Sequence, residues 1–187
     1  MKRLFVLGIS FLFFLPRLWA QSPLMLEVDP LAYAMEGHSG AVKFPLFGSP
    51  WVFGGGTFAL KLPQAALEQE AQDKDVQMEI LPGSRAFALD WFLDPKDNYA
   101  GWHFGVMRAQ LNYRLERKEL SQEAEFKTQG DLFRFGYQWY LSESFYLDFW
   151  AGSGKEALVS GETQVGDYHH EIPSRRQMAT LHLGYAF

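Results

Sequence analysis

The chain has 187 residues, no cysteine and a formal net charge of −5 at pH 7. Without cysteine it can hold no disulfide, no thiolate metal site and no lipid attached through an amino-terminal cysteine. An acidic balance without clustered Lys and Arg also disfavours nucleic acid as a partner, because phosphate binding requires clustered basic charge.

The first twenty residues have the pattern of a secretory signal peptide. Lys2 and Arg3 precede an apolar run at 4–15 that is short for a membrane-crossing helix, and the small residue Ala20 ends the segment. We expect cleavage after Ala20, with an uncleaved amino-terminal anchor as the alternative. Cleavage would take three of the 17 basic residues and leave 14 against 22 acidic ones, a net charge near −8. The remainder, 21–187, suits one domain.

Alternating apolar and polar residues predict an all-β fold. Aromatic residues make up 17% of the chain, glycines are frequent, and one segment after another repeats with a period of two. Such a period is typical of strands with one apolar and one polar face. Strands are predicted at 37–46, 51–62, 86–93, 101–115, 132–141, 145–152 and 179–187, and a first, less regular one at 23–33, where Pro30 predicts a kink.

Short turns and long polar connections alternate between these eight segments. The turns are predicted at 47–50, 94–98 and 142–144, and the long connections at 64–79, 116–125 and 160–175, with a helical turn or two in 64–79. Outer-membrane barrels have short periplasmic turns, long outer loops and both termini on the periplasmic side. The alternation therefore predicts an eight-stranded antiparallel transmembrane up-and-down β-barrel over 21–187.

The last nine residues carry the most specific pattern in the chain. They end on Phe187, and apolar residues, Tyr185 among them, occupy every second position upstream. This segment resembles the closing strand of Gram-negative outer-membrane barrels, whose assembly machinery reads a terminal aromatic residue. The whole chain is similar in pattern to the small outer-membrane families typified by OmpX, OmpW and the OmpA membrane domain. The resemblance implies an outer-membrane location, contact with lipid and lipopolysaccharide, Tyr185 and Phe187 as the assembly signal, and a monomer.

Placing the apolar residues outward leaves charges of both signs for the interior. The interior of an eight-stranded barrel is just wide enough for side chains to fill, so opposite charges can pair across it. We predict a structural charge network of Asp90, Arg108, Arg134 and Asp148, with an ion or proton path as the alternative. The further interior candidates are Glu27, Asp29, Lys43, Lys61, Arg114, Glu156, Thr180 and His182.

No catalytic, cofactor or metal motif stands out. His169 and His170 lie beside Asp167 and Glu171, which would suit a metal site or a general base, but a solvated loop lacks the preorganised geometry that either requires. The deacylases that trim lipid A resemble this chain in size, yet their His-x-Ser-Asn group does not occur. We expect a non-enzymatic barrel with a structural or surface-interaction role, no cofactor, and partners engaged through its outer loops. A lipid-A- or phospholipid-modifying enzyme and a narrow solute conduit are the alternatives.

Overall fold

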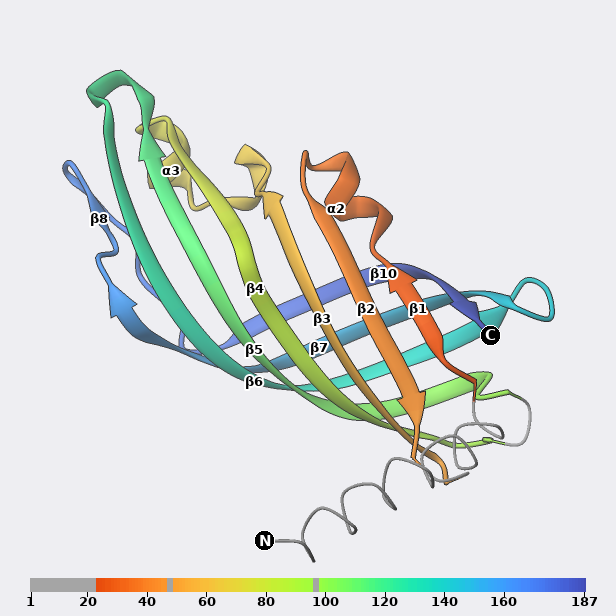
Figure 1. Cartoon of the computed structure of the whole chain (residues 1–187). Coiled ribbons are helices and arrows are strands. Elements are labelled where there is room, and N and C mark those ends of the chain that lie inside the picture. The colour runs from red at the N-terminus through yellow and green to blue at the C-terminus, as the bar shows by residue number, and fades with distance from the viewer. Residues whose placement is uncertain (1–22, 47–48, 96–97) are drawn as a thin grey trace, which may run out of the picture.

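The computed structural model describes residues 23–46, 49–95 and 98–187 (Figure 1). The predicted signal peptide at 1–20 and parts of the turns at 47–50 and 94–98 therefore lie outside the described residues. Within the described ranges, no helix has the length and apolar character that a membrane crossing needs.

Eight strands form one antiparallel sheet that closes on itself into a ring. Each strand pairs with the next along the chain, and the first pairs with the last. The all-β class and the number of eight strands are thus confirmed. The strands are β1 (Met25–Val28), β2 (His38–Pro45), β3 (Trp51–Lys61), β4 (Val76–Phe92), β5 (Gly101–Arg117), β6 (Gln122–Tyr140), β7 (Phe145–Gly161) and β10 (Arg176–Ala186).

The two ends of the ring differ in their connections. At one end, which we call the turn end, lie the short turns and the carboxyl terminus (Figure 1). The other end, the loop end, carries the longer segments (Figure 1). These contain α2 (Pro30–Ala34), η1 (Gln64–Ala66), α3 (Gln69–Asp73), η2 (Lys118–Leu120) and a small hairpin of β8 (Gln164–Val165) and β9 (Tyr168–His169). The helical turns expected within 64–79 are confirmed.

Several strands run further toward the loop end than the sequence predicts. The predicted loop at 116–125 is wrong, because Arg117 pairs with Gln122 and both belong to strands. Charged residues dominate this stretch, but Leu115 just before it and Ala124 within it are buried in the core. Strand β4 likewise begins inside the predicted connection at 64–79, and β7 extends to Gly161.

The first strand exists but is short. Strand β1 pairs with β10 and β2 over only three or four residues. The kink expected at Pro30 is instead the start of a helix. The Asp29 side chain accepts a hydrogen bond of 2.8 Å from the backbone N–H of Leu31, and Pro30 occupies the first turn of α2, where its missing N–H is no loss.

Along the strands, the apolar residues change from the outward face near the turn end to the inward face near the loop end. We call this reversal the face exchange. Near the turn end, β5 exposes Trp102 and Phe104 and buries His103. Toward the loop end, the same strand exposes Arg108 and buries Leu115. Outward apolar residues thus surround the turn-end half, as a band that we call the apolar belt: Leu26, Val28, Val42, Phe44, Trp51, Phe87, Trp91, Trp102, Phe104, Val106, Phe133, Phe135, Tyr137, Trp139, Phe145, Phe149, Leu181 and Leu183.

The loop-end half has the opposite arrangement, with an apolar interior. Its core contains Val76, Met78, Ile80, Leu111, Tyr113, Leu115, Ala124 and Phe126 from the strands. Helix α3 adds Ala71, and the β8–β9 hairpin adds Val165 and Tyr168, so these elements pack over that end of the ring. The predicted connection at 160–175 is therefore partly a folded cover and not only a solvated loop.

Candidate functional site

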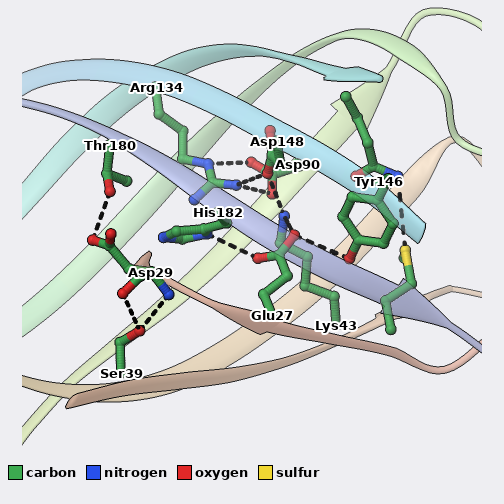
Figure 2. A network of polar contacts seen from close by, with 12 residues as sticks. Glu27, Asp29, Ser39, Lys43, Asp90, Arg134, Tyr146, Asp148, Thr180 and His182 are labelled. Carbon is green, nitrogen blue, oxygen red and sulfur yellow. Dashed lines mark hydrogen bonds and ion pairs between the residues drawn. The ribbon is translucent and has the colours of Figure 1, made fainter. Parts of the chain in front are cut away.

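Charged and polar side chains from seven strands meet inside the turn-end half. They point inward because they alternate with the residues of the apolar belt. All are buried except His182, which is partly exposed. We call this group the polar cluster: Glu27, Lys43, Asp90, His103, Arg134, Tyr146, Asp148 and His182. Figure 2 labels all of them except His103.

Arg134 and Asp90 form a two-pronged ion pair within the polar cluster. Arg134 donates from Nε to Asp90 Oδ1 and from Nη2 to Asp90 Oδ2, both at 2.7 Å. The side chains of the pair are 3% and 1% exposed. The guanidinium also lies 4.8 Å from the centroid of the Trp150 ring, which adds a cation–π contact. Each charge is thus compensated where water has little access.

Lys43 joins the other two carboxylates of the polar cluster. Its Nζ lies 2.6 Å from Glu27 Oε1 and 2.6 Å from Asp148 Oδ2. Asp148 Oδ1 is 2.8 Å from His103 Nε2. Glu27 Oε2 is 3.0 Å from His182 Nδ1 (Figure 2). Tyr146 donates its hydroxyl to Glu27 Oε1 at 3.1 Å. Three carboxylates therefore face two permanent cations, two imidazoles and a phenol.

The polar cluster contains the only candidate metal-ligand set found among the described residues. Ligand atoms of Glu27, Asp148 and His182 lie within 4.8 Å of one another. The ammonium of Lys43 already lies 2.6 Å from both carboxylates, where a bound cation would meet it. The arrangement thus supplies its own cation, and its chemistry is that of internally paired charges that cross-link strands.

The structure brings together three of the four residues predicted for the charge network. Asp90, Arg134 and Asp148 meet in the polar cluster, whereas Arg108 does not. Arg108 points outward, is 62% exposed in its side chain and pairs with Asp131 at 2.7 Å. The predicted inward position of Arg108 was wrong, because the outward positions of β5 change from apolar to charged between Val106 and Arg108.

The other interior candidates divide in the same way. Lys61 and Arg114 are exposed or half exposed and pair with acidic residues on the outer surface. Glu27, Lys43 and Glu156 lie inside as expected. Sequence reasoning missed His103 and Tyr146, although the outward aromatic residues on either side of His103 would have placed it inward.

A second buried ion pair lies between the polar cluster and the loop-end core. Arg176 Nη1 lies 2.8 Å from each carboxylate oxygen of Glu156. Tyr113 and Thr128 also donate their hydroxyls to this carboxylate. The pair ties β10 to β7, and both residues come from strands that the sequence predicted to be shorter.

The histidines at 169 and 170 do not meet their acidic neighbours in one site. His169 Nδ1 is 3.4 Å from Thr163 Oγ1, and His170 Nδ1 is 3.3 Å from the Tyr168 hydroxyl. Asp167 pairs instead with Arg117 and Lys74. These contacts hold the β8–β9 hairpin to its neighbours, which is a structural role.

Acid should loosen the β8–β9 hairpin. Burial lowers the pKa of His170 below its usual 6.5, and the ring lies 5.7 Å from that of Phe126. The His170 imidazole binds a proton more readily when the hairpin is unfolded. The contribution of neutral His170 to the stability of the hairpin is therefore complete above pH about 6.5 and is lost as the pH falls below it. Amide hydrogen exchange at 164–169 should therefore be faster at pH 5.5 than at pH 7.5, after correction for intrinsic rates.

The control for this pH effect is His170→Gln, which keeps a polar side chain but cannot titrate. His169, Glu68, Glu156 and Arg176 act on His170 electrostatically and remain in both proteins. An equal pH response in the variant would show that another group is responsible.

We compared the chain with protein-family models, with curated proteins and with solved structures, and none of the three comparisons found a match.

Proposed function

We propose that the chain is a non-enzymatic transmembrane β-barrel in the outer membrane of a Gram-negative bacterium. The exchange of faces along the strands carries the proposal. A water-soluble protein buries its apolar side chains, whereas the apolar belt exposes aromatic and aliphatic residues around half of the ring. A bilayer is the environment that matches such a surface, and a closed sheet leaves no unpaired edge within it.

The position of the face exchange suggests where the bilayer ends. Beyond the apolar belt, outward positions carry paired charges such as Arg108 with Asp131 and Arg114 with Glu125. Those residues suit water and lipid head groups, and the apolar core behind them suits a protein that continues past the membrane. The loop end then projects outward, with outer-membrane lipid and lipopolysaccharide as its neighbours.

The charge pairs inside the ring favour a structural or surface-interaction role over a conduit. At the level of the apolar belt, Arg134 of β6 pairs with Asp90 of β4 and Lys43 of β2 pairs with Asp148 of β7, so these contacts join strands that are not neighbours in the ring. Rigid, paired charges at this level oppose the passage of ions or solutes. The ordered loop end, with α3 and the β8–β9 hairpin folded over it, is then the surface that meets partners.

Heat-dependent gel mobility tests the membrane barrel. The mature chain, refolded in detergent, should run faster on a cold gel than after boiling, because a closed hydrogen-bonded ring resists detergent until heated. A chain lacking residues 21–28 is the control, since the ring cannot close without β1. Identical mobility before and after boiling, together with solubility in plain buffer, would rule out the proposed membrane location.

A further inference from the structure

A cavity of about 310 Å³ lies inside the ring above the polar cluster. That is about twice the ~150 Å³ of an engineered apolar cavity that holds benzene. Small and apolar residues, including Gly54, Ala86, Ala88, Met107 and Met178, line its walls. Gly54, Ala86 and Ala88 have small side chains or none, which leaves the space open.

The part of the cavity next to the polar cluster is polar and offers hydrogen-bond donors. Trp150 lines it, is 3% exposed, and has an indole N–H that is buried without a partner. Arg134 spends Nε and Nη2 on Asp90, and no hydrogen bond of its Nη1 is found among the described residues. His182 also lines the cavity and uses only Nδ1, toward Glu27. An occupant that accepts hydrogen bonds would satisfy this set.

One side wall of the cavity is a short helix and not a strand. Strand β1 ends at Val28, whereas β10 on one side and β2 on the other continue toward the loop end. Helix α2 covers the resulting gap and presents Leu31, Ala32 and Met35 to the cavity. Leu31 is also 47% exposed, so α2 is a thin wall of the cavity.

Asp29 holds this wall in place from both sides. Its backbone N–H donates to Ser39 Oγ of β2 at 2.5 Å, and Thr180 Oγ1 of β10 donates to its carboxylate at 2.7 Å (Figure 2). Side-chain contacts such as these thus replace the ladder of backbone hydrogen bonds that closes the rest of the ring. The wall at α2 is the place where a molecule from the surrounding bilayer could reach the cavity with the fewest backbone bonds broken.

From the lining, the unpartnered donors and the α2 wall, we propose that the cavity binds a single-chain lipid amphiphile. Its hydrocarbon chain lies against Ala86, Ala88 and Met107, and its head group accepts hydrogen bonds from Trp150 and Arg134. A carboxylate and an ester carbonyl share this acceptor chemistry. The proposal rests on the membrane location proposed above, because the occupant comes from the bilayer.

Native mass spectrometry of the refolded full mature chain can test binding. The probes are oleate, monooleoylglycerol and hexadecane, each added to protein in detergent of fixed composition. The wild type should retain oleate, monooleoylglycerol or both, and whichever is retained identifies the head group. Ala88→Phe fills the cavity and should abolish retention, whereas Val106→Phe, a similar change on the outward face, should not.

A second variant separates the head-group contact from cavity volume. Trp150→Phe keeps an aromatic ring beside Arg134 but removes the unpartnered N–H. It should weaken retention of whichever probe with a head group the wild type retains, oleate or monooleoylglycerol, about fivefold. Retention of hexadecane should not change. Equal retention of every probe by wild type, Ala88→Phe and Trp150→Phe, or retention by none of them, would overturn the proposal.

Gel mobility of the same samples distinguishes the two proposals from each other. If the wild type shows heat-dependent mobility but retains no amphiphile, the cavity proposal fails and the membrane barrel stands. If it shows no heat-dependent mobility, the membrane barrel fails and the cavity proposal falls with it. Heat-dependent mobility of Ala88→Phe shows that its loss of binding is not a loss of folding.

Discussion

Arg134→Leu should lower the free energy of unfolding by about 3–5 kcal/mol, because it leaves a buried carboxylate without its partner. Asp90 is fully buried, and Arg134 donates one hydrogen bond to each of its two carboxylate oxygens. Urea unfolding of the chain in lipid vesicles, followed by tryptophan fluorescence, measures the change. Arg134→Leu combined with Asp90→Leu should recover most of the loss, since no buried charge then remains unpaired.

The chain contains a closely matched control for this experiment. Arg108 also donates from Nε and Nη2 to one carboxylate, that of Asp131, at 2.7 and 2.8 Å. The geometry is the same as in the buried pair, but both side chains are 62% exposed. Arg108→Leu should leave the unfolding curve unchanged within error, because water and salt screen an exposed pair. Equal effects of Arg108→Leu and Arg134→Leu would mean that burial does not set the strength of these pairs.

A charge introduced into the apolar belt should destabilise the protein only if the belt faces lipid. Phe135 is 44% exposed on the outward face of β6. Phe135→Arg should lower the free energy of unfolding in vesicles by about 2–4 kcal/mol if the residue lies near the middle of the bilayer. In water, the same change would replace an exposed aromatic ring by a solvated charge and would have little effect.

The matched variant for the belt is Gln129→Arg. Gln129 lies on the same strand and the same face as Phe135, but beyond the apolar belt. We expect no measurable change in unfolding there, because an arginine at this level meets water or lipid head groups. Similar effects of the two substitutions would contradict the proposed position of the bilayer boundary at the face exchange.

Much of the fold could be predicted because period-two alternation is a local signal. The alternating runs around Phe87, Phe135 and Phe149 show which residues share a face of a strand. An antiparallel up-and-down sheet that closes into a ring also requires an even number of strands. The extent of the strands could not be predicted in this way. Residues 116–125 are rich in charge and resemble a loop, and only cross-strand pairing such as that of Arg114 with Glu125 shows that these charges belong to a sheet.

The candidate site could be predicted only where the apolar residues of the alternating pattern face outward. Asp90, Arg134 and Asp148 alternate with outward aromatic residues, so their inward position follows from the sequence. Arg108 alternates with apolar residues too, but those residues are the interior of the loop-end core. Sequence pattern alone does not tell lipid from protein interior. The cavity and the contacts of Lys43 also depend on which strands face each other across the ring, which no local pattern records.

The short strand β1 has a consequence for the order in which the protein folds. The pairing of Met25 with Ala186 joins the first strand of the ring to the last, and closing so large a loop carries the greatest entropic penalty of any contact in the ring. The hairpins of β4 to β7 are local and should form first. Glu27 arrives only with β1, so until that final step Lys43 lacks one of its two carboxylates and His182 lacks its carboxylate partner. Completion of the ring and completion of its internal ion pairs are therefore one event, and an unfinished ring lacks the contacts that Glu27 makes with Lys43 and His182.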